Sequence, residues 1–440
     1  MTLVQNLRRR LSGNESYLVF IVLFFFCILS CTGSKKSVSL KPENAKSKVA
    51  IPEKKDTIDN KIPIKEKIDT AAIIFPKEIK NNYRIAYLLP FKLNSLDDEE
   101  DKQPGGISRA AVEFYMGSLV ALENTTGMLN SNTTYNARFF DTEKSDPYLK
   151  NITLKALDKF NPDLIIGPFF PSEIKIVSAY SLIKRTTTVC PLANVPECLK
   201  VNPYLIAEKP PQFKYIQSFV QYFKRNYTDG KIILFGSTKK ENDTNLYLFN
   251  KVDSILSKTV STVVVNESNW GNTSYLNPLK SEKTFFYIPI TNEFVVNSIL
   301  SNLMKSDKNE NLVIFAPYKW LEFNSIDISY LLSLNIIFTT DHYINYKDEI
   351  NKEFIKAYRE KFNTEPTKYS FLGYEITLFY GNALSFYGKY FQDGFLIKTI
   401  PDIYFGFNPG YSFGPIKGFE RVTIKYLRFD EYELKEYKTE

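Results

Sequence analysis

The chain has 440 residues, of which 44% are apolar and 24% charged, enough for two or three domains with buried cores. Its single histidine, His342, excludes a histidine-rich metal centre, and a zinc site of four cysteines would need every cysteine in the chain. The net charge of +7 resides in residues 1–80, which hold 15 Lys+Arg and 8 Asp+Glu. Residues 81–440 therefore carry no net charge, and a general nucleic-acid binder is not expected.

The first residues have the pattern of a secretory signal. Three arginines at 8–10 precede an uninterrupted apolar run of 13 residues, Tyr17–Leu29. At ~1.5 Å per residue this run spans about 20 Å, which is short of a ~30 Å bilayer core. Residues 28–31 resemble a bacterial lipobox, which implies that Cys31 is lipidated and that residues 1–30 are a lipoprotein signal peptide. An uncleaved anchor is the alternative, and either one puts the body outside the cytoplasm.

Residues 31–80 are predicted to be a disordered tether. Positions 32–80 hold 12 Lys, 7 Asp+Glu, four Pro and one aromatic residue, Phe75. Such a composition buries too little apolar surface to fold alone. As a flexible coil it would span roughly 40 Å, enough to hold a domain clear of a bilayer.

From residue 81 short apolar runs alternate with amphipathic segments. The runs predict strands at 84–90, 137–140, 163–166 and 187–190, and helices at 107–123, 146–160 and 172–183. Asp146 is the expected N-cap of the second helix, with Pro147 at N1. Strands and helices in strict alternation predict a parallel sheet with helices on both faces.

The pattern restarts at Lys231 and predicts a second lobe of the same kind. Strands are expected at 231–235, 261–265, 284–289, 312–316 and 336–339, with helices at 241–257, 292–304 and 325–334. Two longer helices are expected at 348–362 and 371–391, followed by a late strand or hairpin at 422–426. No GxGxxG or Walker sequence follows any strand, so no phosphate-binding loop is predicted.

Short motifs in this order resemble the type I periplasmic substrate-binding proteins. They read RIAYLLP at 84–90, FYMG at 114–117, DLIIGP at 163–168, CPLAN at 190–194 and GYE at 373–375. The resemblance is to the branched-chain amino acid receptor type, in the divergent lipoprotein form of Bacteroidetes. It implies an α/β fold of two Rossmann-like lobes with parallel sheets, joined by three hinge crossings, with a ligand held between the lobes.

The resemblance also divides the chain. Lobe 1 is expected at 81–205 plus 339–395, and lobe 2 at 206–338 plus 396–440. The crossings are expected near 203–208, 338–341 and 395–400.

Only some of the residues expected in the receptors' binding loops are present in this chain. Of the serines expected after the third strand only Ser172 is present, and Lys319 stands where an acidic residue normally receives the ligand's ammonium group. A free α-amino acid is therefore not expected, and a larger, acidic or partly apolar ligand, or a protein-binding groove, suits the loops better. The predicted ligand-binding residues are Phe169, Ser172, Ala193, Asn194, Tyr287, Tyr318, Lys319 and Trp320. The alternative is that the aromatic members belong to the core.

Cys190 and Cys198 could form a disulfide in an oxidising compartment, or Cys190 could be a packed thiol. The expected function is a lipid-anchored, periplasm-facing protein of the cell envelope that captures a solute for an ABC transporter or sensor. No catalysis, cofactor or metal is expected, and the partners would be an unknown solute or envelope protein and the membrane. The alternative is an interaction lipoprotein of the same fold that regulates peptidoglycan synthesis or another envelope partner.

Overall fold

The computed structural model describes residues 79–95, 106–123, 133–227, 230–236, 261–272, 275, 283–305, 311–392, 411–412, 418–421 and 423–437. The contacts of the chain separate Ala71–Glu440 from Met1–Thr70, and all described residues belong to the former. The predicted signal peptide, lipidated Cys31, nearly all of the predicted tether, the helix at 241–257 and the crossing at 395–400 lie outside the described residues.

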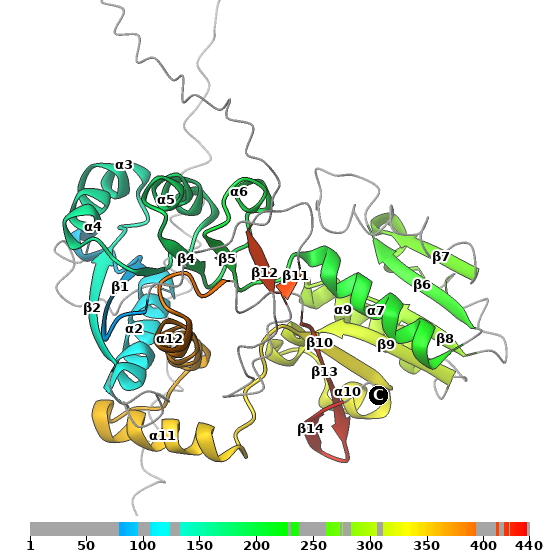
Figure 1. Ribbon diagram of the computed structural model, residues 1–440. Helices are drawn as coiled ribbons and strands as arrows, with labels where there is room; N and C mark the ends of the chain where they lie inside the picture. Colours follow the sequence, from blue (N-terminus) through cyan, green and yellow to red (C-terminus); the bar gives the residue numbers. More distant parts are fainter. Residues whose placement is uncertain are drawn as a thin grey trace, which may run out of the picture. The chain divides into compact units, whose positions relative to one another are not determined.

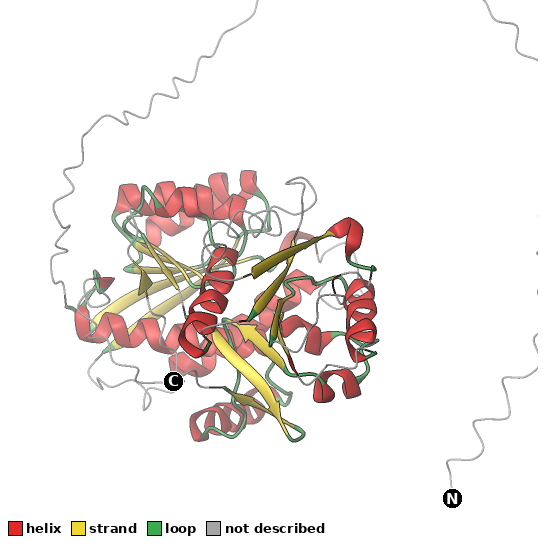
Figure 2. Ribbon diagram, turned by 90° about the vertical axis from the view of Figure 1, so that its right-hand side faces the viewer, coloured by secondary structure: helices red, strands yellow, loops and turns green. Residues whose placement is uncertain are grey.

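The first sheet has seven strands in the order β11-β12-β5-β4-β3-β1-β2, and only the β11–β12 pair is antiparallel. Their bounds are β1 Asn82–Leu89, β2 Thr134–Asp141, β3 Leu164–Ile166, β4 Thr187–Cys190, β5 Leu205–Ala207, β11 Tyr411–Ser412 and β12 Phe419–Arg421. Helices flank the strands in Figures 1 and 2. Alternate residues of β1 pack into two cores, Tyr87 into one and Ala86 into the other, so the strand is one apolar run.

The helices associated with this sheet are α2 Gly106–Glu123, α3 Asp146–Tyr148, α4 Leu154–Phe160, α5 Pro171–Lys184, α6 Pro196–Leu199, α11 Glu349–Phe362 and α12 Lys368–Tyr387, with a 3-10 turn, η1, at Leu93–Ser95. The helix predicted at 146–160 is divided by a π-helical segment, η3 Leu149–Thr153. Its N-cap is Ser145, whose hydroxyl accepts the Tyr148 N–H, and not Asp146. Asp146 already occupies the first helical position, which leaves its neighbour to cap.

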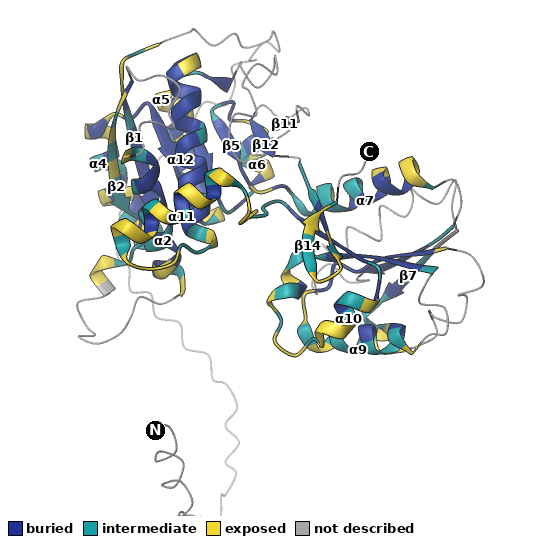
Figure 3. Cartoon of the chain, turned by 90° about the horizontal axis from the view of Figure 1, so that it is seen from below, coloured by how far each residue is buried: buried dark blue, intermediate teal, exposed yellow. Residues whose placement is uncertain are grey.

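Two glycines bring α2 and α12 into backbone contact. A Cβ atom on Gly117 would lie 1.8 Å from the Ser370 carbonyl oxygen, and one on Gly373 would lie 2.1 Å from that of Phe114. Helix α12 is buried along most of its length, whereas α11 has an exposed outer face (Figure 3). Glycine at these two positions therefore allows the backbones of α2 and α12 to pack directly against each other.

The second sheet has the order β14-β13-β10-β9-β8-β6-β7 and is parallel from β7 to β10. Its strands are β6 Lys231–Gly236, β7 Ser261–Asn266, β8 Thr284–Tyr287, β9 Leu312–Pro317, β10 Ile336–Thr340, β13 Lys425–Asp430 and β14 Glu433–Glu436. Its helices are α7 Gln212–Asn226, α9 Glu293–Met304 and α10 Ile328–Ser333, with 3-10 turns η4 Glu267–Asn269 and η7 Tyr318–Glu322. Helix α10 is shorter than the predicted 325–334 because Asp327 caps it.

The prediction of an α/β fold with two mostly parallel sheets is confirmed. Strands β11 and β12 differ from expectation, because β12 pairs with β5 in the first sheet, whereas residues 396–440 were assigned to the second lobe. Strand β12 ends at Arg421 in the first sheet and β13 begins at Lys425 in the second, so the chain passes from one sheet to the other between these residues.

Candidate functional site

Three connecting segments join the two sheets where their parallel strands end. The first follows β5 at Glu208, the second follows β10 at Asp341, and the third follows β12 at Arg421. Carboxyl ends of parallel strands are where open α/β sheets bind ligands. The polar side chains of these segments are therefore the first candidates for a site.

A buried carboxylate holds the first and third segments together. The Tyr380 hydroxyl of α12 donates to Glu208 Oε1, and Arg421 Nη1 lies 3.9 Å from Glu208 Oε2. All three side chains are almost wholly buried. A buried charge is tolerated only when it is paired and hydrogen-bonded, so these three residues depend on one another.

Asn194 extends this group of residues. Its Nδ2 donates to the Lys209 carbonyl at 3.0 Å and reaches the buried Glu420 Oε2 at 3.4 Å. Asn194 therefore lies beside the first and third segments. We call Asn194, Glu208, Tyr380, Glu420 and Arg421 the crossing cluster.

The second segment approaches the same place. Burial, followed by the nearby carboxylate of Asp341, raises the pKa of Tyr215 on α7 well above its ordinary value, and Arg421 acts in the opposite direction. Asp341 and Tyr215, beside the cluster, and Asn194, within it, are half-buried.

His342 pairs with a helix of the first lobe and not with its neighbour Asp341. Its Nε2 lies 2.7 Å from Oε2 of Glu375, a buried residue of α12. Adjacent residues in an extended segment point apart, so Asp341 and His342 face different surroundings.

Three of the predicted aromatic ligand residues are core residues. Phe169 packs edge-on against Phe114 with ring centroids 5.3 Å apart. Trp320 is fully buried and donates its indole N–H to the Ile290 carbonyl at 2.8 Å. Tyr287 lies in the core beneath α7, where burial raises its pKa. These side chains therefore match the alternative that the sequence left open.

The other predicted residues lie nearer the surface. Ser172, in the first turn of α5, and Lys319, in η7, are exposed, Tyr318 is half-buried, and Ala193 is buried beside Asn194. In the predicted set, Asn194 donates hydrogen bonds to Lys209 and to Glu420 of the crossing cluster. A binding role for the eight residues stays a prediction.

The loop after β3 has a feature that the sequence did not reveal. Gly167 has φ +104°, and a Cβ atom there would lie 2.2 Å from the Leu88 carbonyl oxygen, so the turn into α5 requires glycine. Glu173 follows in the first turn of α5 and is fully buried. Burial raises the pKa of Glu173 to about 7, against the lowering effect of hydrogen bonds with Thr142 and with the backbone of Phe170.

Cys190 and Cys198 are free thiols that pack in one apolar cluster with Ile174 and Leu199. Burial raises the pKa of Cys190 far above its ordinary value. The packed-thiol alternative therefore describes Cys190 in this structure.

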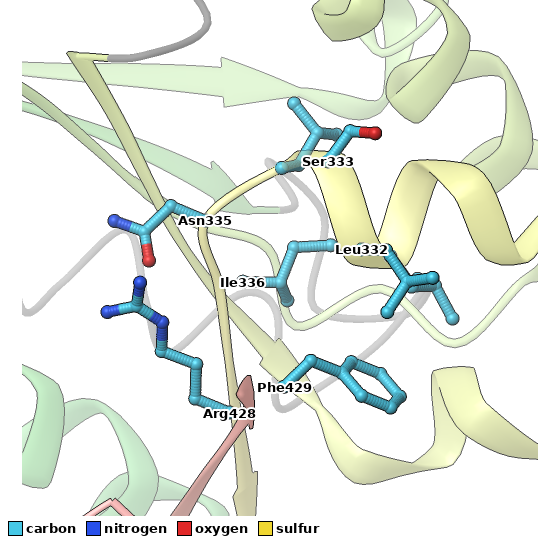
Figure 4. A pocket seen from close by; sticks show the side chains of 8 residues that line it. Leu332, Ser333, Asn335, Ile336, Arg428 and Phe429 are labelled. Atoms are coloured by element: carbon cyan, nitrogen blue, oxygen red, sulfur yellow. The ribbon is translucent and has the colours of Figure 1, made fainter. Parts of the chain in front are cut away.

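Figure 4 shows a small pocket at the opposite end of β10, lined by the end of α10, its loop to β10, and two residues of β13. The Asn335 amide and the Arg428 guanidinium face each other there. The pocket lies about 15 Å along β10 from the connecting segments, so it is separate from the crossing cluster.

Within the described ranges no group of three or more His, Cys, Asp or Glu side chains is arranged to hold a metal ion. None of the helices in the described part of the chain has the length and hydropathy needed to cross a membrane.

No protein-family model matches this chain, and no curated protein matches it in sequence. Many solved structures match its fold. A putative branched-chain amino acid ABC transporter protein from Rhodospirillum rubrum is 13% identical, with a TM-score of 0.59, and the match covers 81% of this chain and 100% of that one.

Two further solved structures also match the fold of this chain. A branched-chain amino acid ABC transporter periplasmic ligand-binding protein from Burkholderia xenovorans is 12% identical with a TM-score of 0.55, and the match covers 81% of this chain and 94% of that one. An ABC transporter substrate-binding protein from Sphaerobacter thermophilus is 15% identical with a TM-score of 0.52, and the match covers 81% and 96%. At these identities the likeness concerns the fold: the chain has the two-lobed α/β fold of the type I periplasmic binding proteins.

Proposed function

We propose that the chain is a lipid-anchored solute-binding protein of the cell envelope that faces the periplasm, captures a small molecule between its lobes and performs no catalysis. The crossing cluster is the single observation that carries this proposal. The first and third connecting segments contribute Glu208 and Arg421 to it, and Asp341 of the second segment lies close to Tyr215, whose pKa Arg421 also affects. A solute bound to these segments would gain contacts from both lobes at once, which favours a closed form.

The charges of the cluster favour a particular class of solute. Glu208, Glu420 and Asp341 supply three carboxyl groups against the one guanidinium of Arg421, which already faces Glu208. Half-buried Asp341 offers carboxylate oxygens to hydrogen-bond donors, whereas Asn194 Oδ1 is buried and Asn194 Nδ2 donates to Lys209 and Glu420. A neutral or cationic solute with hydroxyl or amino groups suits this arrangement better than the acidic ligand inferred from Lys319.

Thermal unfolding of the processed chain, from residue 32 on, tests the proposal against a panel of amino acids, peptides, sugars and muropeptides. A ligand present at ~100 times its Kd adds about 2.7 kcal/mol to the free energy of unfolding. Asn194→Ala and Asp341→Asn should each remove the shift. Asn297→Ala is the matched control, because Asn297 also donates its amide to a backbone carbonyl, at 2.8 Å, but on α9. A shift that survives both cluster variants, or no shift with any compound, would contradict the proposal.

A second candidate is the interaction lipoprotein that acts on peptidoglycan synthesis. It is favoured by exposed apolar side chains on the second lobe, where Phe294 of α9 is 83% exposed and Ile328 of α10 is 56% exposed. The Ser325 N–H donates to Glu293, and the Asn297 amide donates to the Ser325 carbonyl, which holds this part of α9 next to the loop before α10. If this candidate is correct, Phe294→Asp should abolish co-purification with a peptidoglycan synthase and any stimulation of its activity, while Asn194→Ala should affect neither.

A further inference from the structure

The edge at which the parallel strands of the first sheet begin is a second candidate for a functional surface. It lies away from the crossing cluster. Strands β1, β3, β4 and β5 are parallel, and their registers align Ile85 with Leu164, Leu164 with Thr187 and Thr188 with Leu205. Segments that precede these strands therefore meet at one edge, opposite the end where the connecting segments leave.

This edge exposes apolar side chains next to cations. Ile183, in the last turn of α5, is 78% exposed, and Val201, just after α6, is 58% exposed. Arg185 lies two residues after Ile183, Lys200 directly precedes Val201, and both cations are exposed. Asn202 donates its amide to Ser178 and Ser181 of α5, which holds the end of α6 against that helix.

Two half-buried tyrosines complete the surface. The rings of Tyr204 and Tyr390 have centroids 6.1 Å apart, and Lys389 Nζ lies 5.3 Å from the Tyr390 centroid. Arg185 is close enough to Tyr204 to lower its pKa against the larger raising effect of burial. We call Ile183, Arg185, Lys200, Val201, Tyr204 and Tyr390 the basic edge.

Positive charge dominates at this edge in the part of the chain that the structure describes. Two of its lysines are paired, Lys184 with Asp158 and Lys80 with Asp163. Arg185 and Lys200 have no carboxylate within 4.0 Å among the described residues. The charges cancel within each of these two pairs, so Arg185 and Lys200 give the basic edge a net positive charge.

The chain reaches the first lobe at this same edge. The described residues begin at Ile79, which is 52% exposed and directly precedes β1. In the order β4-β3-β1, the start of β1 is two strands from Arg185, about 10 Å at the usual strand spacing. The segment before it is basic in sequence and leads back to Cys31, the predicted site of lipidation.

From this placement we propose that the basic edge docks on the surface of an anionic phospholipid bilayer. Arginine and lysine attract anionic headgroups, tyrosines favour the interface between headgroups and hydrocarbon, and Ile183 and Val201 can insert shallowly. A weak intrinsic affinity is sufficient, because the tether keeps the lobe at a high effective concentration near the membrane. Docking would turn the opposite end of the lobe, with the crossing cluster, away from the bilayer.

Vesicle co-sedimentation tests the proposal with the processed chain from residue 32 on, which lacks the lipid but contains all of Ala71–Glu440. The vesicles contain phosphatidylcholine alone or with an equal part of phosphatidylglycerol. The chain should bind the anionic vesicles more tightly than the neutral ones, and added salt should weaken binding. Each cation removed from a membrane-facing surface costs about fivefold in affinity, so Arg185→Gln with Lys200→Gln should reduce binding by about 25-fold.

The matched control removes the same two residue types from the second lobe. Lys224 and Arg225 are exposed in the last turn of α7, and Lys224→Gln with Arg225→Gln gives the same change in net charge. This variant should bind anionic vesicles like the wild-type chain. Equal binding to neutral and anionic vesicles, or equal losses in the two double variants, would overturn the proposal. Unchanged thermal unfolding in both variants confirms that each is folded.

Discussion

Glu173 gives a prediction whose size follows from its surroundings. The side chain is fully buried, and this burial raises its pKa from the ordinary 4.5 to about 7. The folded chain therefore binds this proton more tightly than the unfolded chain does. Its contribution to stability is fully present below about pH 4.5 and is lost as pH rises through about 7.

The magnitude follows from the two proton affinities. At about 1.4 kcal/mol for each tenfold difference, ionised Glu173 costs about 3 kcal/mol near pH 8 and less than about 1 kcal/mol near pH 5. Glu173→Gln removes the ionisation and keeps the shape of the side chain. In a cooperative unit of about 370 residues, 3 kcal/mol corresponds to roughly 4 °C in Tm.

Thermal unfolding followed by circular dichroism measures this effect. Glu173→Gln should raise Tm at about pH 8 and change it much less at about pH 5. The control is Glu197→Gln, because Glu197 also lies in the first turn of a helix, α6, but is exposed. It should change Tm little at either pH. A Glu173→Gln variant that is equally stable at both pH values, or less stable at the higher one, would refute the reasoning.

Two further predictions concern packing in the first lobe. Gly373→Ala should lower stability by about 1–3 kcal/mol, because the new methyl group would lie 2.1 Å from the Phe114 carbonyl oxygen and must force α12 away from α2; an unchanged Tm would show that the helices do not touch there. The processed chain contains only two cysteines, Cys190 and Cys198, and half-exposed Cys198 should react with a thiol reagent before buried Cys190. In denaturant both thiols should react. Denatured, unreduced protein that labels neither thiol would instead reveal a disulfide.

The fold could be predicted because both sheets are covered on two faces. In β6, Ile232 and Leu234 enter one core and Ile233 and Phe235 enter the other, so the strand is a continuous apolar run in the sequence. The same feature concealed the role of Tyr287, since an apolar run does not tell which residues face a ligand.

Helix α7 was not predicted, although the spacing of its apolar residues indicates a helix. Ile216, Phe219, Val220 and Phe223 recur at helical spacing and form the buried face of α7. The N-cap of α3 differs by one residue, because Ser145 and Asp146 are both good caps and only the backbone decides between them.

Most of the candidate site could not be predicted from the sequence. Glu208, Tyr380 and Arg421 are far apart in the chain, and common residue types carry no local pattern that would pair them. Trp320 was expected in a cleft because of its position after a strand, yet its indole N–H is satisfied inside the core by Ile290. Asn194, a predicted residue, belongs to the cluster because its amide reaches Glu420 of β12.

The central claim is that a small solute is held by groups at the connecting segments. Native mass spectrometry of the lipid-anchored chain, extracted from the cell envelope under non-denaturing conditions, tests it most directly. The account predicts a folded chain that carries a small additional mass, which is released by collision and is missing from the Asn194→Ala variant. A folded wild-type chain that shows only its own mass, before and after incubation with the solute panel, would contradict it.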